Sequence, residues 1–357
     1  MEVPLSGSSA GSPGAQCFAT TRNHEVATLS GFPNSMPCTS PLHAYAPAPA
    51  PEGGSKSKLF ADGPARSRKL VFSASKSYQG ARAITVPCGQ CLGCLLDRSR
   101  EWAVRAVHEA SQHEHNYFVT LTYDDEHLPA DRSVSLRELQ LFKKRLRNNE
   151  GAFRYLSCGE YGDTTLRPHY HTILFGLPLS DLRPWSKSNS GEMLYRSATI
   201  EKHWTHGIAY IGHVTMQSAG YVARYSIKKS QGKHQPDRYR RTAIDPTTGE
   251  VREWHVDPEF LAMSKKPGLG AGWFEKYKAD AFPSDFLVVD GKRVPVPRFY
   301  LNLLAKDDAF QTLRVQAKRK LNGLKHADNN TDRRLATRHE SQQLRAKRLH
   351  RSHDAES

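Results

Sequence analysis

The sequence predicts an α+β fold in which a mainly antiparallel central sheet is backed by helices. Segments rich in β-branched and aromatic residues indicate strands, and they fall at residues 117–125, 153–158, 169–176 and 208–215. Amphipathic helical patterns lie before and between these segments. Because a strand with one apolar face must bury that face against another layer, we expect the helices to cover the sheet.

Two helices can be placed from their patterns. The first is expected from about Leu92 to Ala110, with core spacing of Leu95, Trp102, Ala106 and Ala110. The second begins at Ser135, because Ser-Leu-Arg-Glu matches a capping box and an apolar stripe follows it. The second helix also carries a basic run, Lys143, Lys144, Arg145 and Arg147. Such a run is typical of a solvated helix face, and contact with DNA phosphates is the functional alternative.

Composition divides the chain into four regions. Residues 1–57 are rich in Ser, Pro, Ala and Gly and are expected to form a disordered arm. Residues 58–230 contain the predicted sheet and form the main folded domain. Residues 231–304 are an accessory region of unknown role, with a hairpin turn expected at Pro246–Gly249. Residues 305–357 predict a charged, basic helical tail that would add sequence-independent contacts with DNA.

The charge balance favours a polyanionic partner. The 357 residues contain 51 Lys and Arg against 36 Asp and Glu, which gives a formal net charge of +15. ATPase and helicase activities are not supported, because the chain has no Gly-Lys-Ser/Thr motif and its Gly268–Gly272 glycines are too loosely spaced for a nucleotide-binding loop. Trp204, Trp254 and Trp273 are candidates either for stacking on unpaired bases or, as the commoner case, for the core.

Cysteine usage predicts a reducing compartment and a candidate structural metal site. The chain shows no secretory signal pattern, and its six cysteines are not distributed as a disulfide framework. Cys88, Cys91 and Cys94 have Cys-x-x-Cys-x-x-Cys spacing at the start of the first helix. Such a turn can hold Zn²⁺ or an iron–sulfur cluster, both of which normally need a fourth ligand, and Cys158 or His108 is the candidate. The alternative is reduced thiols packed in a turn. Any metal here would serve folding and not catalysis.

A histidine pair marks the strand that begins after Arg167, which reads Pro-His-Tyr-His-Thr-Ile-Leu-Phe. Successive side chains on a strand point to opposite faces, so His169 and His171 project together while Tyr170 points away. The pair can therefore bind one metal ion. Taken alone it is weak evidence, because two half-exposed histidines are the commoner explanation of such a pair.

Residues 218–230, SAGYVARYSIKKS, predict a helix with chemically active side chains on one face. Tyr221 and Tyr225 are four residues apart and Lys228 follows three residues later, so the three form one polar stripe. A phenol needs a metal ion or a nearby cation before it becomes a good nucleophile. The alternatives are an aromatic rib of a core helix and a solvated cation at the helix end.

These motifs resemble those of the HUH endonucleases, which initiate rolling-circle replication. The resemblance rests on three segments in order, FVTLTY, PHYHTILFG and YVARYSIKK. The doubled tyrosine resembles the gene A type initiators of small icosahedral single-stranded DNA phages. The surrounding segments PCGQCLGC, LDRSREWAVRAVHEA and GEYGDTTLRPHYH are similar to those of replication initiators of gokushovirus-type microviruses. The similarity spans about Val86 to Ser230.

The resemblance implies a fold, an activity and a site. It implies an HUH-type nicking domain and a metal-dependent, site-specific endonuclease and strand transferase for single-stranded DNA at the replication origin. Tyr221 or Tyr225 would attack the phosphodiester, form a 5′ phosphotyrosyl link and free a 3′ hydroxyl primer, with Lys228 in the catalytic group. Host helicase and DNA polymerase would be partners, in the host bacterial cytoplasm and without a membrane.

The resemblance also implies the third metal ligand. Because an acidic ligand commonly precedes the histidine pair in the family, Glu160 is expected to join His169 and His171, with Asp163 as the alternative. Mixed nitrogen and oxygen ligands with open positions suit Mg²⁺ or Mn²⁺.

Two other functions fit parts of the same pattern. A plasmid relaxase or a transposase would share the histidine strand and the tyrosines, although large relaxases usually carry a fused helicase, whose motif this chain lacks. A non-catalytic DNA-binding metalloprotein would use the histidines and cysteines structurally. That protein would bind DNA without forming a covalent adduct.

Overall fold

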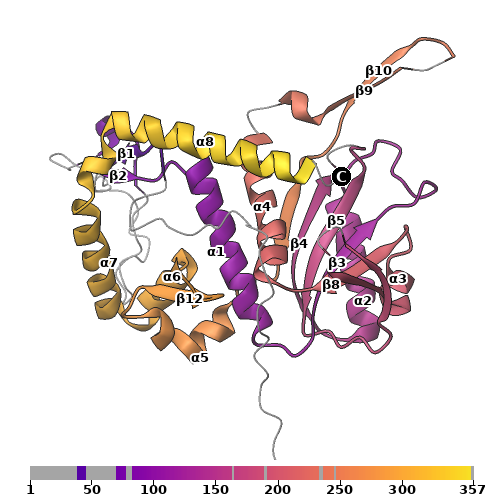
Figure 1. Ribbon diagram of the computed structural model, residues 1–357, viewed down its shortest axis with the longest axis horizontal. Coiled ribbons are helices and arrows are strands. Elements are labelled where there is room, and N and C mark those ends of the chain that lie inside the picture. The colour runs from indigo at the N-terminus through magenta and orange to yellow at the C-terminus, as the bar shows by residue number, and fades with distance from the viewer. Residues whose placement is uncertain are drawn as a thin grey trace, which may run out of the picture. The chain divides into compact units, whose positions relative to one another are not determined.

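A computed structural model describes residues 38–45, 70–77, 83–162, 165–188, 191–232, 236–244 and 247–354 (Figure 1). Only the backbone is described for residues 225–232, 236, 238 and 345–354. The chain divides into two units, Met1–Gly31 and Phe32–Ser357, and every described residue belongs to the second unit.

A seven-stranded antiparallel sheet forms the centre of the fold, as predicted (Figure 1). Its strand order is β11-β4-β5-β3-β8-β7-β6. The four predicted strands correspond to β3 (Asn116–Thr122), β4 (Arg154–Tyr161), β5 (Pro168–Phe175) and β8 (Ala209–His213). The other strands are β6 (Arg183–Lys187), β7 (Met193–Arg196) and β11 (Phe260–Met263). No prediction was made for β6 because all five of its residues are exposed, so it lacks an apolar run.

Helices cover both faces of the sheet, and alternate residues of each strand serve the two layers. One face packs on α1 (Leu92–Ala110) and α4 (Met216–Gly232), with Ile173 and Phe175 of β5 in the shared core. The other face packs on α2 (Leu136–Glu150) and α3 (Ala198–His203), with Tyr170 and Leu174 of β5 in that core. The predicted bounds of the first helix match α1. The capping box at the start of α2 is also confirmed, because the Ser135 hydroxyl accepts a hydrogen bond from the Glu138 amide at 3.2 Å.

A second apolar cluster lies outside the sheet. It combines Val104 of α1 with side chains of α5 (Ala271–Ala281), β12 (Phe286–Val289), α6 (Arg298–Asp307) and α7 (Ala309–Leu324). Strand β12 pairs with β13 (Lys292–Pro295) in a separate two-stranded sheet. The chain then passes through η3 (Ala327–Asn330) into α8 (Asp332–Asp354). None of the helices in the described part of the chain is long and apolar enough to cross a membrane.

The remaining elements are short. Strand β1 (Leu42–Ala44) pairs with β2 (Ile84–Val86), and β9 (Arg240–Ile244) pairs with β10 (Val251–His255). The 3₁₀ helices η1 (Ala74–Lys76) and η2 (Pro236–Tyr239) precede β2 and β9. The hairpin turn predicted at Pro246–Gly249 falls between β9 and β10, although Pro246 itself lies outside the described residues.

Three of the predicted regional boundaries differ from the observed elements. Residues 38–45 belong to the predicted disordered arm, yet they contain β1. Strand β11 lies beyond residue 230, yet it pairs with β4 of the central sheet. The predicted tail contains Val315, which is 2% exposed in the second apolar cluster. Composition did not reveal these boundaries because each depends on contacts between segments that are distant in the sequence.

Candidate metal and tyrosine site

The pairing of β4 with β5 places three candidate metal ligands on one face of the sheet. Glu160 lies directly opposite His169, and Cys158 lies opposite His171. Because side chains alternate along a strand, Glu160, His169 and His171 share this face. Tyr170 points to the opposite face, where it is fully buried beneath α2 and α3.

The three ligand atoms converge on a single carboxylate oxygen. His169 Nε2 lies 2.8 Å from Glu160 Oε1, and His171 Nε2 lies 2.7 Å from the same atom. The two imidazole rings are 5.0 Å apart and nearly perpendicular. One ligand atom from each of the three residues lies within 4.8 Å of the others, so the group could hold a metal ion.

Each imidazole is oriented through its other nitrogen. His169 Nδ1 lies 3.2 Å from the Arg167 carbonyl oxygen, and His171 Nδ1 lies 2.9 Å from the Thr120 hydroxyl. A carbonyl oxygen can only accept a hydrogen bond, so we assign a proton to Nδ1 of His169. Partners of this kind fix the tautomer and the direction of metal-binding histidines.

Glu160 is buried and held as a carboxylate. Its residue is 1% exposed. Burial opposes ionisation, but the hydrogen bonds from His169 and His171 outweigh burial and lower the pKa of the Glu160 carboxyl to about 2. A buried negative charge flanked by two imidazoles is therefore present at neutral pH.

Helix α4 brings Tyr221 to this carboxylate. The Tyr221 hydroxyl donates a hydrogen bond to Glu160 Oε1 at 3.0 Å. Its ring packs edge-on against His171 at 4.9 Å and against Phe118 of β3 at 6.4 Å. Burial is the main factor that raises the pKa of the Tyr221 phenol, and the Glu160 carboxylate adds to it. The phenol is thus protonated when it faces an uncompensated Glu160.

The start of α4 explains why Tyr221 reaches the sheet. The Ser218 amide donates to the Thr215 hydroxyl at 3.1 Å, and the Thr215 amide donates to the Ser218 hydroxyl at 2.8 Å. These reciprocal bonds satisfy amides that the first turn of a helix leaves without partners. Ala219 and Val222 are fully buried against the sheet, so the helix rotation presents Tyr221 to the same face.

Three predicted site residues cannot be compared at the side-chain level. Helix α4 continues through Tyr225 and Lys228, but the side chains of both lie outside the described part of the chain. Asp163, the alternative third ligand, also lies outside the described residues. The grouping of Glu160 with the histidines therefore concerns the preferred ligand only.

The basic run on α2 does not form one exposed face. Lys143 is 2% exposed, and its Nζ lies 3.6 Å from the centre of the Tyr155 ring. Arg145 donates from Nε to the His203 carbonyl oxygen at 3.0 Å. Lys144 and Arg147 are exposed. The helix covers the sheet face opposite the histidines, so these cations are separated from the candidate site by the sheet.

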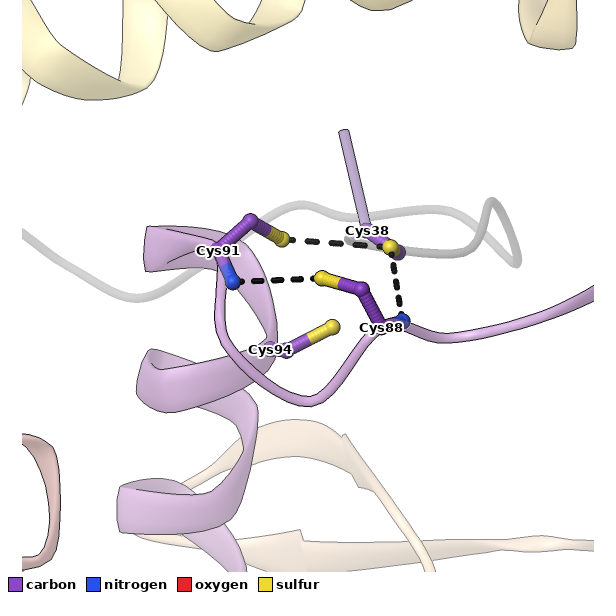
Figure 2. A group of neighbouring side chains, drawn as sticks. All are labelled: Cys38, Cys88, Cys91 and Cys94. Atoms are coloured by element: carbon purple, nitrogen blue, oxygen red, sulfur yellow. Dashed lines mark hydrogen bonds between the residues drawn. The ribbon is translucent and has the colours of Figure 1, made fainter. Parts of the chain in front are cut away.

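The cysteine turn has a different fourth neighbour from either predicted residue. Cys88, Cys91 and Cys94 lie together with Cys38, and their sulfur atoms are all within 4.8 Å of one another (Figure 2). Cys158 lies in β4 opposite His171. His108 Nδ1 lies 2.9 Å from the Tyr300 hydroxyl, and its ring stacks on Trp273 at 3.7 Å. Both candidates are therefore used elsewhere in the fold.

The tryptophans follow the commoner of the two alternatives. Trp204 is 1% exposed and Trp273 is 8% exposed, and both belong to apolar clusters. Trp254 is half-buried and donates from Nε1 to the Asp131 carbonyl oxygen at 2.7 Å. All three have packing or hydrogen-bonding roles within the chain.

Sequence reasoning missed three residues at these sites. Phe118 and Thr120 lie in the FVTLTY strand, and its two-residue period already placed both on one face. The pairing of Thr120 with His171 requires the sheet register, which the strand pattern does not contain. Cys38 stood apart in a segment judged by composition, although an uneven count of three clustered cysteines called for a fourth.

Comparison with known proteins identifies the family. The family model of the replication-associated protein ORF2 matches residues 116–230, which include β3, β5 and α4. Replication-associated protein VP4 of Bdellovibrio phage phiMH2K is 35% identical over 263 residues, which cover 71% of this chain and 78% of that protein. No solved structure matches the chain.

Two further relatives have the same kind of name. Replication-associated protein ORF2 of Spiroplasma virus 4 is 34% identical, covering 66% of this chain and 73% of that protein. Replication-associated protein ORF4 of Chlamydia phage 1 is 31% identical, covering 66% of this chain and 58% of that protein. The chain belongs to the phage replication-associated protein family and is a replication initiator of the gokushovirus type.

Proposed function

We propose that this chain is a metal-dependent, site-specific single-strand DNA endonuclease and strand transferase of the HUH type, which starts and ends rolling-circle replication. One observation carries the proposal. The Tyr221 hydroxyl and two histidine nitrogens all contact the same oxygen of Glu160, at 3.0, 2.8 and 2.7 Å. A candidate nucleophile therefore lies beside a candidate metal-binding group.

The residues present fit a divalent cation. Two imidazole nitrogens and one buried carboxylate supply two neutral ligands and one negative charge, a donor set that Mg²⁺ and Mn²⁺ accept. Because His169 Nδ1 faces a carbonyl oxygen, Nε2 is the nitrogen directed at the carboxylate, as in a metal-binding imidazole. When bound, the cation would polarise the scissile phosphate as a Lewis acid.

Tyr221 would act as a nucleophile on the phosphorus of the scissile phosphodiester. Its oxygen forms a new bond to phosphorus while the bond from phosphorus to the 3′ oxygen breaks. The phenol loses its proton and the departing 3′ oxygen gains one, so the products are a 5′ phosphotyrosyl link and a free 3′ hydroxyl. The phosphodiester energy is retained in the link, so a 3′ hydroxyl can later attack it and rejoin the DNA without ATP.

Tyr225 and Lys228 complete the proposal. Tyr225 follows Tyr221 by four residues on α4, which is the spacing of neighbours on one helix face. Two phenols one turn apart could alternate, one holding the DNA while the other cleaves the regenerated origin. Lys228 would supply positive charge to the phosphate.

We infer the partners from the family and from charge. Single-stranded DNA at the phage replication origin would be the substrate, and the formal net charge of +15 favours such a polyanion. On α2 only the exposed Lys144 and Arg147 are candidates for phosphate contact. Host helicase and DNA polymerase would complete replication in the host bacterial cytoplasm.

The test is a denaturing gel of the full chain with single-stranded DNA that spans the cognate origin, with Mn²⁺, with Mg²⁺ and with a chelator. We expect a metal-dependent protein–DNA adduct that survives denaturation. The variants are Tyr221→Phe, Tyr225→Phe and the double variant, in which the adduct should disappear. Tyr277→Phe is the matched control, because Tyr277 is 45% exposed on α5.

The outcomes separate the competing functions. An adduct lost only in the double variant supports alternating nucleophiles, and loss in one single variant identifies the tyrosine that attacks first. If wild-type protein binds the origin but forms no adduct with either metal, the nicking proposal fails. The non-catalytic DNA-binding metalloprotein then becomes the better description.

A further inference from the structure

We propose that Cys38, Cys88, Cys91 and Cys94 bind one Zn²⁺ ion that links the segment Cys38–Tyr45 to the start of α1 (Figure 2). The site is separate from the proposed nicking site and would have a structural role. Its ligands come from two stretches that lie 50 residues apart in the chain.

The sulfur geometry fits a single tetrahedral ion. With zinc–sulfur bonds of about 2.3 Å, the sulfur atoms of a four-thiolate site lie about 3.8 Å apart. Cys91 Sγ and Cys38 Sγ are 3.8 Å apart, and all four sulfur atoms lie within 4.8 Å of one another. An iron–sulfur cluster distributes its cysteines over different irons and needs a wider arrangement. The compact group therefore favours a mononuclear site.

Backbone amides already point at these sulfur atoms. Amides of Gln90 and Cys91 donate to Cys88 Sγ at 3.4 and 3.2 Å. The Cys88 amide donates to Cys38 Sγ at 3.3 Å, and the Thr39 amide donates to Cys91 Sγ at 3.4 Å. Amide donors compensate the negative charge of thiolates in metal sites. The turn that allows this includes Gly89, whose φ of +74° is a conformation that favours glycine.

The helix adds a second source of stabilisation. Cys91 is the N-cap of α1 and Cys94 lies in its first turn. The 19-residue helix directs the positive end of its dipole toward these two sulfur atoms. Four thiolates beside this helix end and the amide donors are well suited to a divalent cation.

The segment that contains Cys38 has little else to hold it by apolar burial. Of residues 38–45, only Cys38, Thr39 and Ala44 are buried, and Leu42 is 43% exposed. Polar contacts extend from the segment to two other parts of the chain. Backbone hydrogen bonds join Tyr45 to Val71, and Thr39 Oγ1 lies 3.1 Å from His339 Nδ1 of α8. Because metal binding can supply folding free energy that a small core lacks, loss of Zn²⁺ should release this segment first.

The first experiment measures metal in the full-length protein purified without added metal or chelator. We expect about one zinc per chain by mass spectrometry of the elements, released in proportion as a mercurial reagent titrates four thiols. Replacement by Co²⁺ should give the ligand-field and thiolate charge-transfer absorption of a tetrahedral four-sulfur site. The thiol-dependent release and the charge-transfer band distinguish this site from any metal held by His169 and His171.

The variants test the choice of fourth ligand. Cys38→Ser should lose most of the thiol-releasable zinc, with its circular dichroism spectrum used to verify folding. Cys158→Ala and His108→Ala should retain it, because neither residue joins the sulfur group. Cys17→Ser is the control for losing a cysteine from the N-terminal region, and Cys17 lies outside the described residues.

A structural readout tests the role of the metal. On chelation, hydrogen exchange should accelerate in residues 38–45 and in β2, while β3, β4 and β5 keep their protection. The proposal is overturned if wild-type protein holds no thiol-releasable metal and gives no thiolate–cobalt band. It is also overturned by acid-labile sulfide with iron, by a Cys38–Cys91 disulfide in protein purified under reducing conditions, or by full zinc content in folded Cys38→Ser protein. The wild-type measurements decide the matter even if that variant does not fold.

Discussion

Glu160 and His169 are cross-strand partners on β4 and β5, and His169 Nε2 lies 2.8 Å from Glu160 Oε1. Their contact follows from the register of two antiparallel strands, whose side chains at directly opposed positions are neighbours. His171, two residues farther along β5, contacts the same oxygen at 2.7 Å. A sheet face, rather than a loop, therefore sets the positions of all three groups, and sites on rigid elements hold their geometry well.

Replacing Glu160 tests the third ligand. Glu160→Gln removes the only carboxylate charge among the three grouped residues while keeping the side-chain volume. We expect formation of the metal-dependent adduct to fall by at least about 100-fold, because loss of a ligand should cost more than loss of its outer partners. The measurement is the initial rate of adduct formation at several Mn²⁺ concentrations. Asp163→Asn is the comparison and should behave like wild type. The reverse pattern would transfer the ligand assignment to Asp163.

Thr120 is expected to act on the metal site through His171. Its hydroxyl lies 2.9 Å from His171 Nδ1, so Thr120→Val removes the partner that orients the imidazole while preserving the branched shape. We expect the Mn²⁺ concentration for half-maximal adduct formation to rise by about 10-fold, with a smaller change in the rate at saturating Mn²⁺.

Thr122→Val is the matched control for this positioning role. The Thr122 hydroxyl donates to the Ile208 carbonyl oxygen at 3.1 Å, so its loss removes a hydroxyl from the same strand without touching His171. Equal shifts in the two variants would assign the effect to β3 itself. A selective shift for Thr120→Val, with unchanged thermal stability, would support the role through His171.

Gly207 supports the end of β3 by allowing a close backbone approach. Its φ is +148°, and a Cβ at this position would lie 2.4 Å from the Thr122 carbonyl oxygen and 2.5 Å from the Asp124 amide. Backbone atoms cannot move aside as a flexible side chain can, so Gly207→Ala should destabilise the fold by about 3 kcal/mol or more. Urea unfolding followed by circular dichroism measures the change. Gly212→Ala on β8 should be mild, since its nearest contact would be Leu194 at 3.7 Å.

The sequence predicted the strands that carry the site, because those strands are apolar and long. β3, β4, β5 and β8 are recognisable without a structure, and the period of two placed His169 and His171 on one face. β6 and β11 were not predicted. Every residue of β6 is exposed, and β11 is only four residues long and pairs with a strand about a hundred residues earlier.

The same limit explains the outcome at the two candidate metal groups. Residue types identified Glu160 and the cysteine turn, but the register that opposes Glu160 to His169 depends on a connection of irregular conformation. Cys38 joins Cys88 across 50 residues, and no local pattern encodes that distance. Helix periodicity likewise identified the basic run on α2, but not that Lys143 would be covered by Tyr155. Local pattern predicts elements and faces, whereas contacts between distant segments require the fold.

Lys143 is expected to lower the stability of the protein rather than to bind DNA. Burial is the main cause that lowers the pKa of its ammonium to about 7 in the folded state, against an unfolded value of about 10.4. Below pH 7 both states hold the proton, so the folded state bears the full cost of a buried cation. Between pH 7 and 10 the unfolded state holds more protons, so the stability of wild type increases with pH.

Lys143→Met should therefore stabilise the fold. The contact of the ammonium with the Tyr155 ring offsets part of the burial cost, so we expect a gain of about 1–3 kcal/mol at pH 6. The gain should shrink at pH 9, and non-specific affinity for DNA should not change. Urea unfolding at the two pH values measures the effect, with the exposed neighbour Lys144→Met as a control expected to stay within about 0.5 kcal/mol of wild type. Destabilisation by Lys143→Met at both pH values would mean that the contact with Tyr155 outweighs the cost of burying the charge.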